Sequence, residues 1–233
     1  NDINYLPFNK TRIRLKKEIV SLGKGKIDVE KFGGKPVSPS QWNKLIGNKN
    51  IKTIDIRNSF EIAIGNFKNS INPNTNSFRE FPRKFRELKL NKDTEIAMYC
   101  TGGIRCEKAS AYLKSNGYKK IYQLDGGIIQ YLNYIRSNRD QSCWNGECFV
   151  FDDRVTINKN LKKGNYLQCY GCRHPITKND IKLKSYEKGV SCKYCFSKKN
   201  KTKIQSLRTR SKQIEIKKNN KVNSSFKGIL RPS

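Results

Sequence analysis

Residues 95–105 read Glu95-Ile-Ala-Met-Tyr-Cys-Thr-Gly-Gly-Ile-Arg105. The apolar run 95–99 predicts a buried strand, and residues 107–114 predict a helix. Cys100 therefore stands on a glycine-rich turn between a strand and a helix. The free backbone N–H groups of such a turn and the positive end of the helix dipole both favour thiolate over thiol. We predict an anion cradle with Cys100 as the nucleophile at its centre, to which Arg105 adds a fixed positive charge.

The segments on either side of this loop extend the same pattern. Strands are expected at 51–57, 95–99 and 120–124, and helices at 38–46, 78–88, 107–114 and 128–135. Strands that alternate with helices predict an α/β fold, with a parallel sheet covered by helices on both faces. Ligands of such sheets bind at the carboxyl ends of the strands, which is where Cys100 lies.

The chain of 233 residues divides into four predicted parts. Residues 1–35 form a weak N-terminal piece, and residues 36–140 form the α/β domain. A cysteine-rich module is expected at 141–200. Residues 201–233 are a basic tail, with a helix at about 205–216 and a disordered end.

Several classes of protein are excluded by what the sequence lacks. His174 is the only histidine, which argues against a serine triad and a two-histidine iron site. We find no dinucleotide fingerprint and no flavin or haem motif. The sequence also contains neither a membrane-spanning apolar run nor a signal peptide. We expect a cytoplasmic protein without a membrane partner, whose eight cysteines are catalytic or metal-binding rather than disulfide-bonded.

The net charge of +30 is extreme for a chain of this length. Residues 198–231 are dense in Lys and Arg and contain a single acidic residue, Glu215. This distribution favours a nucleic-acid partner bound through its phosphates. A lysine-rich coding bias is the alternative explanation. A membrane surface would also attract such a tail, but no apolar helix face accompanies it.

Two cysteine pairs in the module have the spacing of a metal site. Cys169 and Cys172 form one C-x-x-C pair, and Cys192 and Cys195 form the other. Four cysteines at this spacing predict a tetrahedral zinc site that would stabilise a segment with few apolar residues. His174 is an alternative ligand. Reduced thiols in a small packed module and a redox relay to Cys100 are the competing interpretations.

Residues 36–135 resemble a rhodanese domain, a fold of the α/β class predicted above. The matching pieces are Ile54-Asp-Ile-Arg57, Phe60-Glu61, Gly65 with Ile71-Asn-Pro73, the loop Cys100 to Arg105, and Leu124-Asp-Gly-Gly127. The loop is one residue shorter than in the related phosphatases, so its size fits sulfur chemistry rather than phosphate chemistry.

Further segments are similar to the rhodanese-family tRNA uridine hydroxylases. These segments are residues 72–82, 99–110, 146–152 and 186–192. The family is described as converting the wobble uridine of tRNA to 5-hydroxyuridine with dioxygen, and Cys100 matches its active-site persulfide cysteine. The resemblance implies that residues 1–35 are the remnant of a small N-terminal α+β domain.

The resemblance also assigns expectations to the rest of the site. The candidate active-site loop comprises Thr101, Gly102, Gly103, Ile104 and Cys106, in addition to the catalytic pair Cys100 and Arg105. Gly102 and Gly103 are expected to let backbone amides approach a substrate or persulfide. Cys106 either resolves a persulfide or disulfide on Cys100, or is a small buried helix residue. Asp55 and Arg57 are expected to be a supporting ion pair, and Glu61 is similar.

Three functions remain open at this point. The leading hypothesis is an oxygen-dependent oxidoreductase that hydroxylates the wobble uridine in the anticodon loop of tRNA, with dioxygen as co-substrate and Cys100 as the persulfide cysteine. The alternative is a sulfurtransferase that passes sulfur from a Cys100 persulfide to tRNA or to a small acceptor. The third is a zinc-stabilised RNA-binding protein without activity, against which an intact Cys100 and Arg105 argue.

Overall fold

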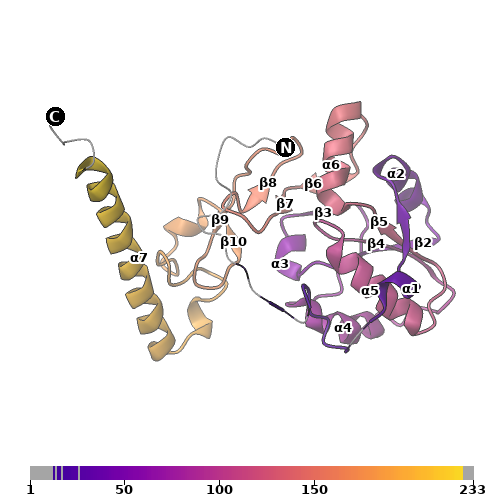
Figure 1. Ribbon diagram of the computed structural model, residues 1–233, viewed down its shortest axis with the longest axis horizontal. Helices are drawn as coiled ribbons and strands as arrows, with labels where there is room; N and C mark the ends of the chain where they lie inside the picture. The colour runs from indigo at the N-terminus through magenta and orange to yellow at the C-terminus, as the bar shows by residue number, and fades with distance from the viewer. Residues whose placement is uncertain (1–12, 14, 17, 26, 228–233) are drawn as a thin grey trace. The chain divides into compact units, whose positions relative to one another are not determined.

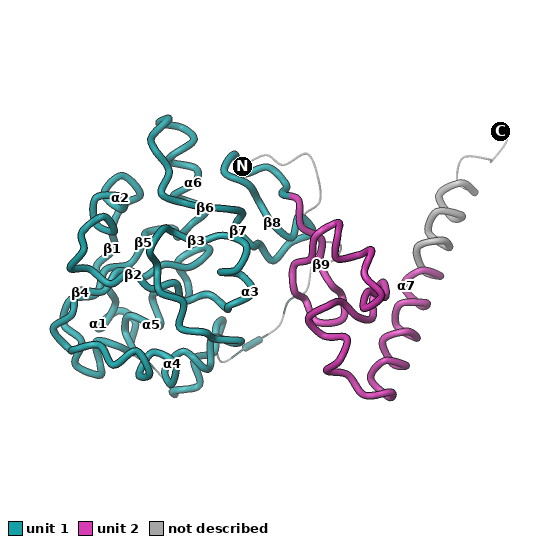
Figure 2. The backbone as a smooth tube through the Cα atoms, turned by 180° about the vertical axis from the view of Figure 1, so that it is seen from behind, with its two compact units in different colours: residues 1–164 teal, residues 165–233 magenta. Residues whose placement is uncertain are grey.

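The computed structural model describes residues 13, 15–16, 18–25 and 27–227, with side chains up to residue 216. The chain forms two compact units, residues 1–164 and 165–233 (Figure 2). The boundary between the units follows Gly164, so residues 141–164, which the sequence grouped with the cysteine-rich module, belong to the first unit. Of the N-terminal piece, the structure shows a short helix α1 at Val29–Phe32.

The first unit is built on a parallel sheet of four strands (Figure 1). Its order is β1 (Lys35–Val37), β5 (Ile121–Leu124), β4 (Glu95–Tyr99) and β2 (Ile51–Asp55). In the pair formed by the edge strand β2 and its neighbour β4, the last residues of the two strands, Asp55 and Tyr99, are register partners. The predicted α/β sheet is confirmed, and the carboxyl ends of β2 and β4 lie side by side.

Helices cover both faces of this sheet, as predicted. They are α2 (Pro39–Gly47), α3 (Ser59–Ile62), α4 (Phe81–Glu87, preceded by the 3-10 helix η1 at Phe78–Glu80), α5 (Ile104–Ser115) and α6 (Gly127–Asn138). Side chains of β4 alternate between the two faces. Ile96 and Met98 pack in the core beneath α4 and α5, whereas Ala97 and Tyr99 pack in the core beneath α2 and α6.

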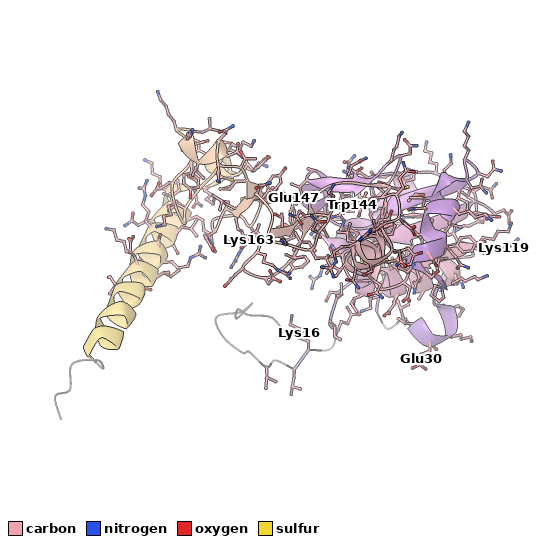
Figure 3. All side chains as sticks on the ribbon, turned by 90° about the horizontal axis from the view of Figure 1, so that it is seen from above. Lys16, Glu30, Lys119, Trp144, Glu147 and Lys163 are labelled. Carbon is pink, nitrogen blue, oxygen red and sulfur yellow. The ribbon has the colours of Figure 1, made fainter. Side chains whose placement is uncertain are left out.

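Two short antiparallel pairs extend the first unit beyond the sheet. Strand β3 (Gly65–Phe67) pairs with β6 (Trp144–Gly146), and β7 (Cys148–Phe149) pairs with β8 (Thr156–Ile157). Trp144 packs its ring edge-to-face on Phe67 at 5.1 Å, and Glu147 accepts a 2.6 Å hydrogen bond from the Thr156 hydroxyl. Both labelled side chains lie at the same end of the first unit in Figure 3.

The second unit has a small core and one long helix. Its elements are β9 (Leu167–Gln168), β10 (Pro175–Ile176), the 3-10 helices η2 (Asp180–Lys182) and η3 (Phe196–Lys198), and α7 (Lys201–Lys227). Buried Leu207 and the Arg208–Glu187 ion pair hold α7 to this unit. The helix predicted at about 205–216 is present but is longer at both ends. Residues 217–227, where a disordered end was expected, are helical, and residues 228–233 lie outside the described residues. Within the described part of the chain, every helix is too short or too polar to cross a membrane.

A fully buried ion pair fixes the end of β2. The Arg57 guanidinium donates to both carboxylate oxygens of Asp55, at 2.9 Å from Nε and 2.6 Å from Nη2. It also donates to the carbonyls of Glu61 and Gly65. Both side chains of the pair are 0% exposed. Arg57 therefore ties β2, α3 and β3 together, in agreement with the expected ion pair.

We predict that Asp55→Asn lowers the free energy of unfolding by about 3–5 kcal/mol, because it leaves the buried Arg57 charge without a counter-charge. Urea denaturation followed by circular dichroism measures this loss. The matched control is Asp93→Asn, which breaks an exposed ion pair with Lys119 at the edge of the first unit (Figure 3). That change should cost about 1 kcal/mol or less. Equal losses in the two variants would contradict the structural role of Asp55.

Candidate active site and metal centre

Cys100 lies where β4 ends and α5 is about to begin, as the sequence predicts. It is 2% exposed, and the Gly103 backbone N–H donates a 3.2 Å hydrogen bond to its Sγ. Gly103 adopts a φ of 88°, a left-handed conformation that favours glycine and turns its amide toward the sulfur. At Gly102, by contrast, an added Cβ would meet open space, so the loop geometry requires glycine at Gly103 only.

The electrostatics of the loop favour the Cys100 thiolate. Burial alone would raise the pKa of Cys100, but the Cys106 thiol, the Arg105 charge and the backbone amides of Cys106 and Arg105 together lower it to about 6. The pKa of Cys106 is raised well above its ordinary value by burial and by Cys100. At neutral pH the pair therefore consists of a thiolate at Cys100 and a protonated thiol at Cys106.

A buried carboxylate holds Arg105 in place. Glu61, from α3, accepts hydrogen bonds from Nη1 and Nη2 of Arg105 at 2.7 and 2.8 Å. Nη2 also donates to the Thr101 hydroxyl at 3.3 Å. Glu61 is 0% exposed and Arg105 is 9% exposed. The paired charges fix the guanidinium at the loop, and the pKa of Arg105 is raised although burial opposes this.

The start of α6 closes the loop from its other side. The amides of Ile128 and Ile129 donate to the carbonyls of Cys100 and Thr101 at 3.0 and 3.1 Å. Gly127 permits this approach, because a Cβ there would lie 2.5 Å from the Cys100 carbonyl oxygen. The two glycine-rich turns of the sequence are thus packed against each other.

The structure brings most of the predicted site residues together. Cys100, Thr101, Arg105 and Cys106 share one loop and helix start, and Ile104 in the same segment is 52% exposed. Asp55 and Arg57 lie behind this loop, where Arg57 donates to the Glu61 carbonyl. Glu61 was expected to form a structural ion pair, and the structure shows this pair with Arg105 of the loop.

Sequence reasoning missed one residue of the site, Phe151. The Arg105 guanidinium carbon lies 6.0 Å from the centroid of the Phe151 ring, which is 67% exposed. The signal that could have found it is its position within 146–152, one of the segments on which the resemblance rests. Cys148 from the same segment is fully buried, and burial raises its pKa to about 12, so it is an unreactive thiol.

The four cysteines of the second unit form a candidate metal centre. The sulfurs of Cys169, Cys172, Cys192 and Cys195 all lie within 4.8 Å of one another. Three of the S···S distances are 3.7, 3.9 and 4.0 Å. A tetrahedral zinc with Zn–S bonds of about 2.3 Å requires sulfurs about 3.8 Å apart, so this arrangement could bind a structural zinc.

The surroundings of the cluster agree with a tetrathiolate. Lys199 places its Nζ 2.6 Å from the Cys195 sulfur, where its charge would offset the excess negative charge of four thiolates around one zinc ion. His174, the alternative ligand, stacks on the Tyr194 ring at 5.0 Å, and the ligand set is completed without it. The cluster also forms much of the core of this unit, together with Ile176.

The fold and site thus define an α/β domain that presents a nucleophilic cysteine in an anion-binding loop. Residues 38–133 match the family model of the rhodanese-like domain. Among solved structures, the chain is similar to a rhodanese-related protein from Thermoplasma volcanium, with 25% identity, 43% of this chain and 92% of that chain covered, and a TM-score of 0.36. A rhodanese-like domain protein from Staphylococcus aureus gives 26% identity, coverage of 42% and 90%, and a TM-score of 0.35. A polysulfide-sulfur transferase from Wolinella succinogenes gives 23% identity, coverage of 46% and 80%, and a TM-score of 0.38.

We predict that Cys100 is alkylated by iodoacetamide with a pH midpoint near 6, because only the thiolate reacts. The rate should rise as the pH increases through 6 and be level above about pH 7.5. Cys106→Ala should move the midpoint upward, since it removes the thiol that helps to lower the Cys100 pKa. Peptide mass spectrometry resolves Cys100 from the other cysteines. A midpoint near 8.5, the ordinary value for cysteine, would contradict the inferred cradle.

We also predict that the purified chain carries one zinc per molecule, measured by plasma mass spectrometry. Cys172→Ser should reduce the zinc content and lower the thermal stability of the second unit, because metal binding there contributes to folding. Cys143→Ser, which changes a half-exposed cysteine of the first unit, is the control and should keep the zinc. A chain that excludes zinc even when refolded with excess metal would leave reduced thiols as the explanation.

Proposed function

We propose that this protein is a rhodanese-type sulfurtransferase that carries sulfur as a Cys100 persulfide and delivers it to tRNA. The observation that carries this proposal is the position of Cys100 in its loop, where the Gly103 amide donates to the sulfur at 3.2 Å. Cys106, Arg105 and the backbone amides of both residues lower the pKa of Cys100 to about 6. The match of residues 38–133 to the rhodanese-like domain supports the same class of chemistry.

The geometry supports a two-step transfer. The Cys100 thiolate attacks the outer sulfur of an anionic sulfane donor such as thiosulfate. A new S–S bond forms at Cys100, and the donor's S–S bond breaks with its electron pair leaving on sulfite. A nucleophilic carbon of the acceptor, such as C5 of uracil, then attacks the outer persulfide sulfur and loses its proton, so that a C–S bond replaces the C–H bond. The persulfide S–S bond breaks, and Cys100 leaves as the thiolate it was at the start. Arg105 and the loop amides stabilise the negative charge in both steps.

Charge supports a nucleic acid as the acceptor. The net charge of +30 is carried by lysines and arginines on both units, whose nitrogen-tipped side chains extend from each in Figure 3. The long helix α7 adds a basic segment whose first part includes exposed Lys201, Lys203 and Lys212. A polyanion bound by such surfaces would bring an unpaired base of a loop to the active site at a low cost in unstacking.

Hydroxylation of the wobble uridine of tRNA is the second candidate. It is favoured by the hairpin formed by β7 and β8, which lies outside the rhodanese-like match and yet places Phe151 beside Arg105. This hairpin contains one of the segments on which the resemblance to tRNA uridine hydroxylases rests. The reaction inserts one atom of dioxygen into the C5–H bond of uracil and reduces the other to water, which takes two electrons from an external reductant such as a dithiol.

One experiment separates the two candidates. The full chain is incubated with undermodified tRNA, sulfur-labelled thiosulfate, labelled dioxygen and a dithiol, and the nucleosides are analysed by mass spectrometry. We expect labelled sulfur on Cys100 and then on the tRNA. Labelled oxygen on uridine instead would establish the hydroxylase.

Controls identify the residue responsible. Cys100→Ser should abolish the persulfide and the product, whereas Cys143→Ser should retain both. A persulfide that never leaves for tRNA but is discharged by cyanide would restrict the protein to small acceptors. Absence of any Cys100 persulfide or product would reject both candidates.

A further inference from the structure

The ring of Phe151 is placed at the active-site loop by contacts that leave its face open. It is 67% exposed, although its neighbour Phe149 is 1% exposed. Phe149 supports it edge-to-face at 5.2 Å and in turn packs edge-to-face on Phe60 at 5.3 Å. Phe60 belongs to α3, the helix that also supplies Glu61 to Arg105. Helix α3 therefore supports both the row of rings Phe60, Phe149 and Phe151 and the ion pair between Glu61 and Arg105.

The backbone around Phe151 is also held in place. Asp152 accepts hydrogen bonds from the Arg154 amide and guanidinium, and the Val150 amide donates to the Val155 carbonyl at 2.9 Å. Val155 adopts a φ of 67°, a conformation that β-branched residues rarely accept. The hairpin tip thus keeps an exposed aromatic ring beside the catalytic loop despite the solvent exposure and this strained residue.

We propose that Phe151 is the platform on which an unpaired nucleobase of the RNA substrate stacks next to Cys100. This inference rests on the proposed function, because it concerns the substrate of the same site. A flat, exposed aromatic surface binds another flat ring. Arg105 lies over the Phe151 ring, 6.0 Å from its centroid, and Glu61 holds Arg105 in place, so the ring is fixed beside the loop while 67% of the residue stays exposed to a stacking base.

The charge around the hairpin fits the backbone of such a substrate. Exposed Lys159, Lys162 and Lys163 follow β8 directly, and Lys163 is labelled in Figure 3. Ile104, half-exposed on the catalytic loop, adds apolar surface next to Arg105 in the sequence. Because Cys100 is 2% exposed, its sulfur can react only with an atom that is brought to the opening of the loop. A base stacked on Phe151 would be held there in a defined plane.

The test compares three variants of the full chain. Phe151→Ala and Phe151→Leu remove the aromatic face, whereas Phe151→Trp keeps it. We expect Ala and Leu to raise the KM for tRNA roughly 5- to 100-fold, the range that loss of base–aromatic stacking produces, and Trp to restore it. Formation of the Cys100 persulfide from thiosulfate is measured in the same variants, and the increase in the KM for tRNA should exceed any change in that step. Phe32→Ala is the matched control. The Phe32 ring also has a cation over it, the Lys31 ammonium, but it lies near the C-terminal end of α5, where Lys114 donates to the Gly33 carbonyl.

A second readout is independent of turnover. A 5-iodouridine-containing RNA loop, irradiated on the protein, should crosslink to Phe151 and to the Trp variant, as mapped by peptide mass spectrometry. An unchanged KM in the Ala variant, with crosslinks elsewhere, would overturn the platform while leaving the proposed function intact. Wild-type protein that forms the persulfide but neither binds nor modifies RNA would overturn both.

Discussion

The buried ion pair between Glu61 and Arg105 is the contact on which the rest of the site depends. Glu61 also accepts a hydrogen bond from the Asn58 amide, so its carboxylate caps α3 while it holds Arg105. Its carbonyl accepts from Arg57, which pairs with Asp55 at the end of β2. Two ion pairs, joined by the hydrogen bond from Arg57 to the Glu61 carbonyl, thus connect the end of β2 to the loop of Cys100. Buried ion pairs seldom add net stability compared with apolar residues. We therefore infer that this network serves to fix the position of Arg105 and to keep its positive electrostatic potential at the loop.

The potential matters because the reactive sulfur is buried. Desolvation opposes a charged Cys100, and a cysteine this enclosed would ordinarily be an inert thiol, as Cys148 is. The difference between the two lies in fixed donors. Cys100 faces the Gly103 amide, the Cys106 thiol and the Arg105 charge, whereas for Cys148 burial outweighs the attraction of nearby Arg57. Because the donors are built into the loop, they need no rearrangement when charge develops on the sulfur.

The parts of the structure that could be predicted are those determined by residues close together in the sequence. The run 95–105 predicted strand β4, the loop and helix α5 because strand period, glycine pair and helix start follow one another within a few residues. The cluster of four cysteines was predictable for the same reason, since each C-x-x-C pair forms a turn of its own. The partner of Arg105 is 44 residues away in the chain, and no periodicity marks it. The sequence grouped the hairpin of β7 and β8 with the cysteine-rich module, because the packing of Phe149 on Phe60 of α3 depends on rings that look like ordinary core residues in the sequence.

The hairpin of β7 and β8 is the part of the first unit at which the proposed substrate would be selected. The loop of Cys100 explains how a sulfur is activated, but a cradle for one anion does not distinguish a small donor from a large acceptor. Residues 134–164 continue the first unit beyond the rhodanese-like match and return to it through β6, β7 and β8. They do so at α3, where Phe60 supports their aromatic tip and Glu61 supports the catalytic arginine. Any shift of α3 would therefore move Arg105 and Phe151 together, so the residue that activates Cys100 and the proposed platform for the substrate depend on one short helix.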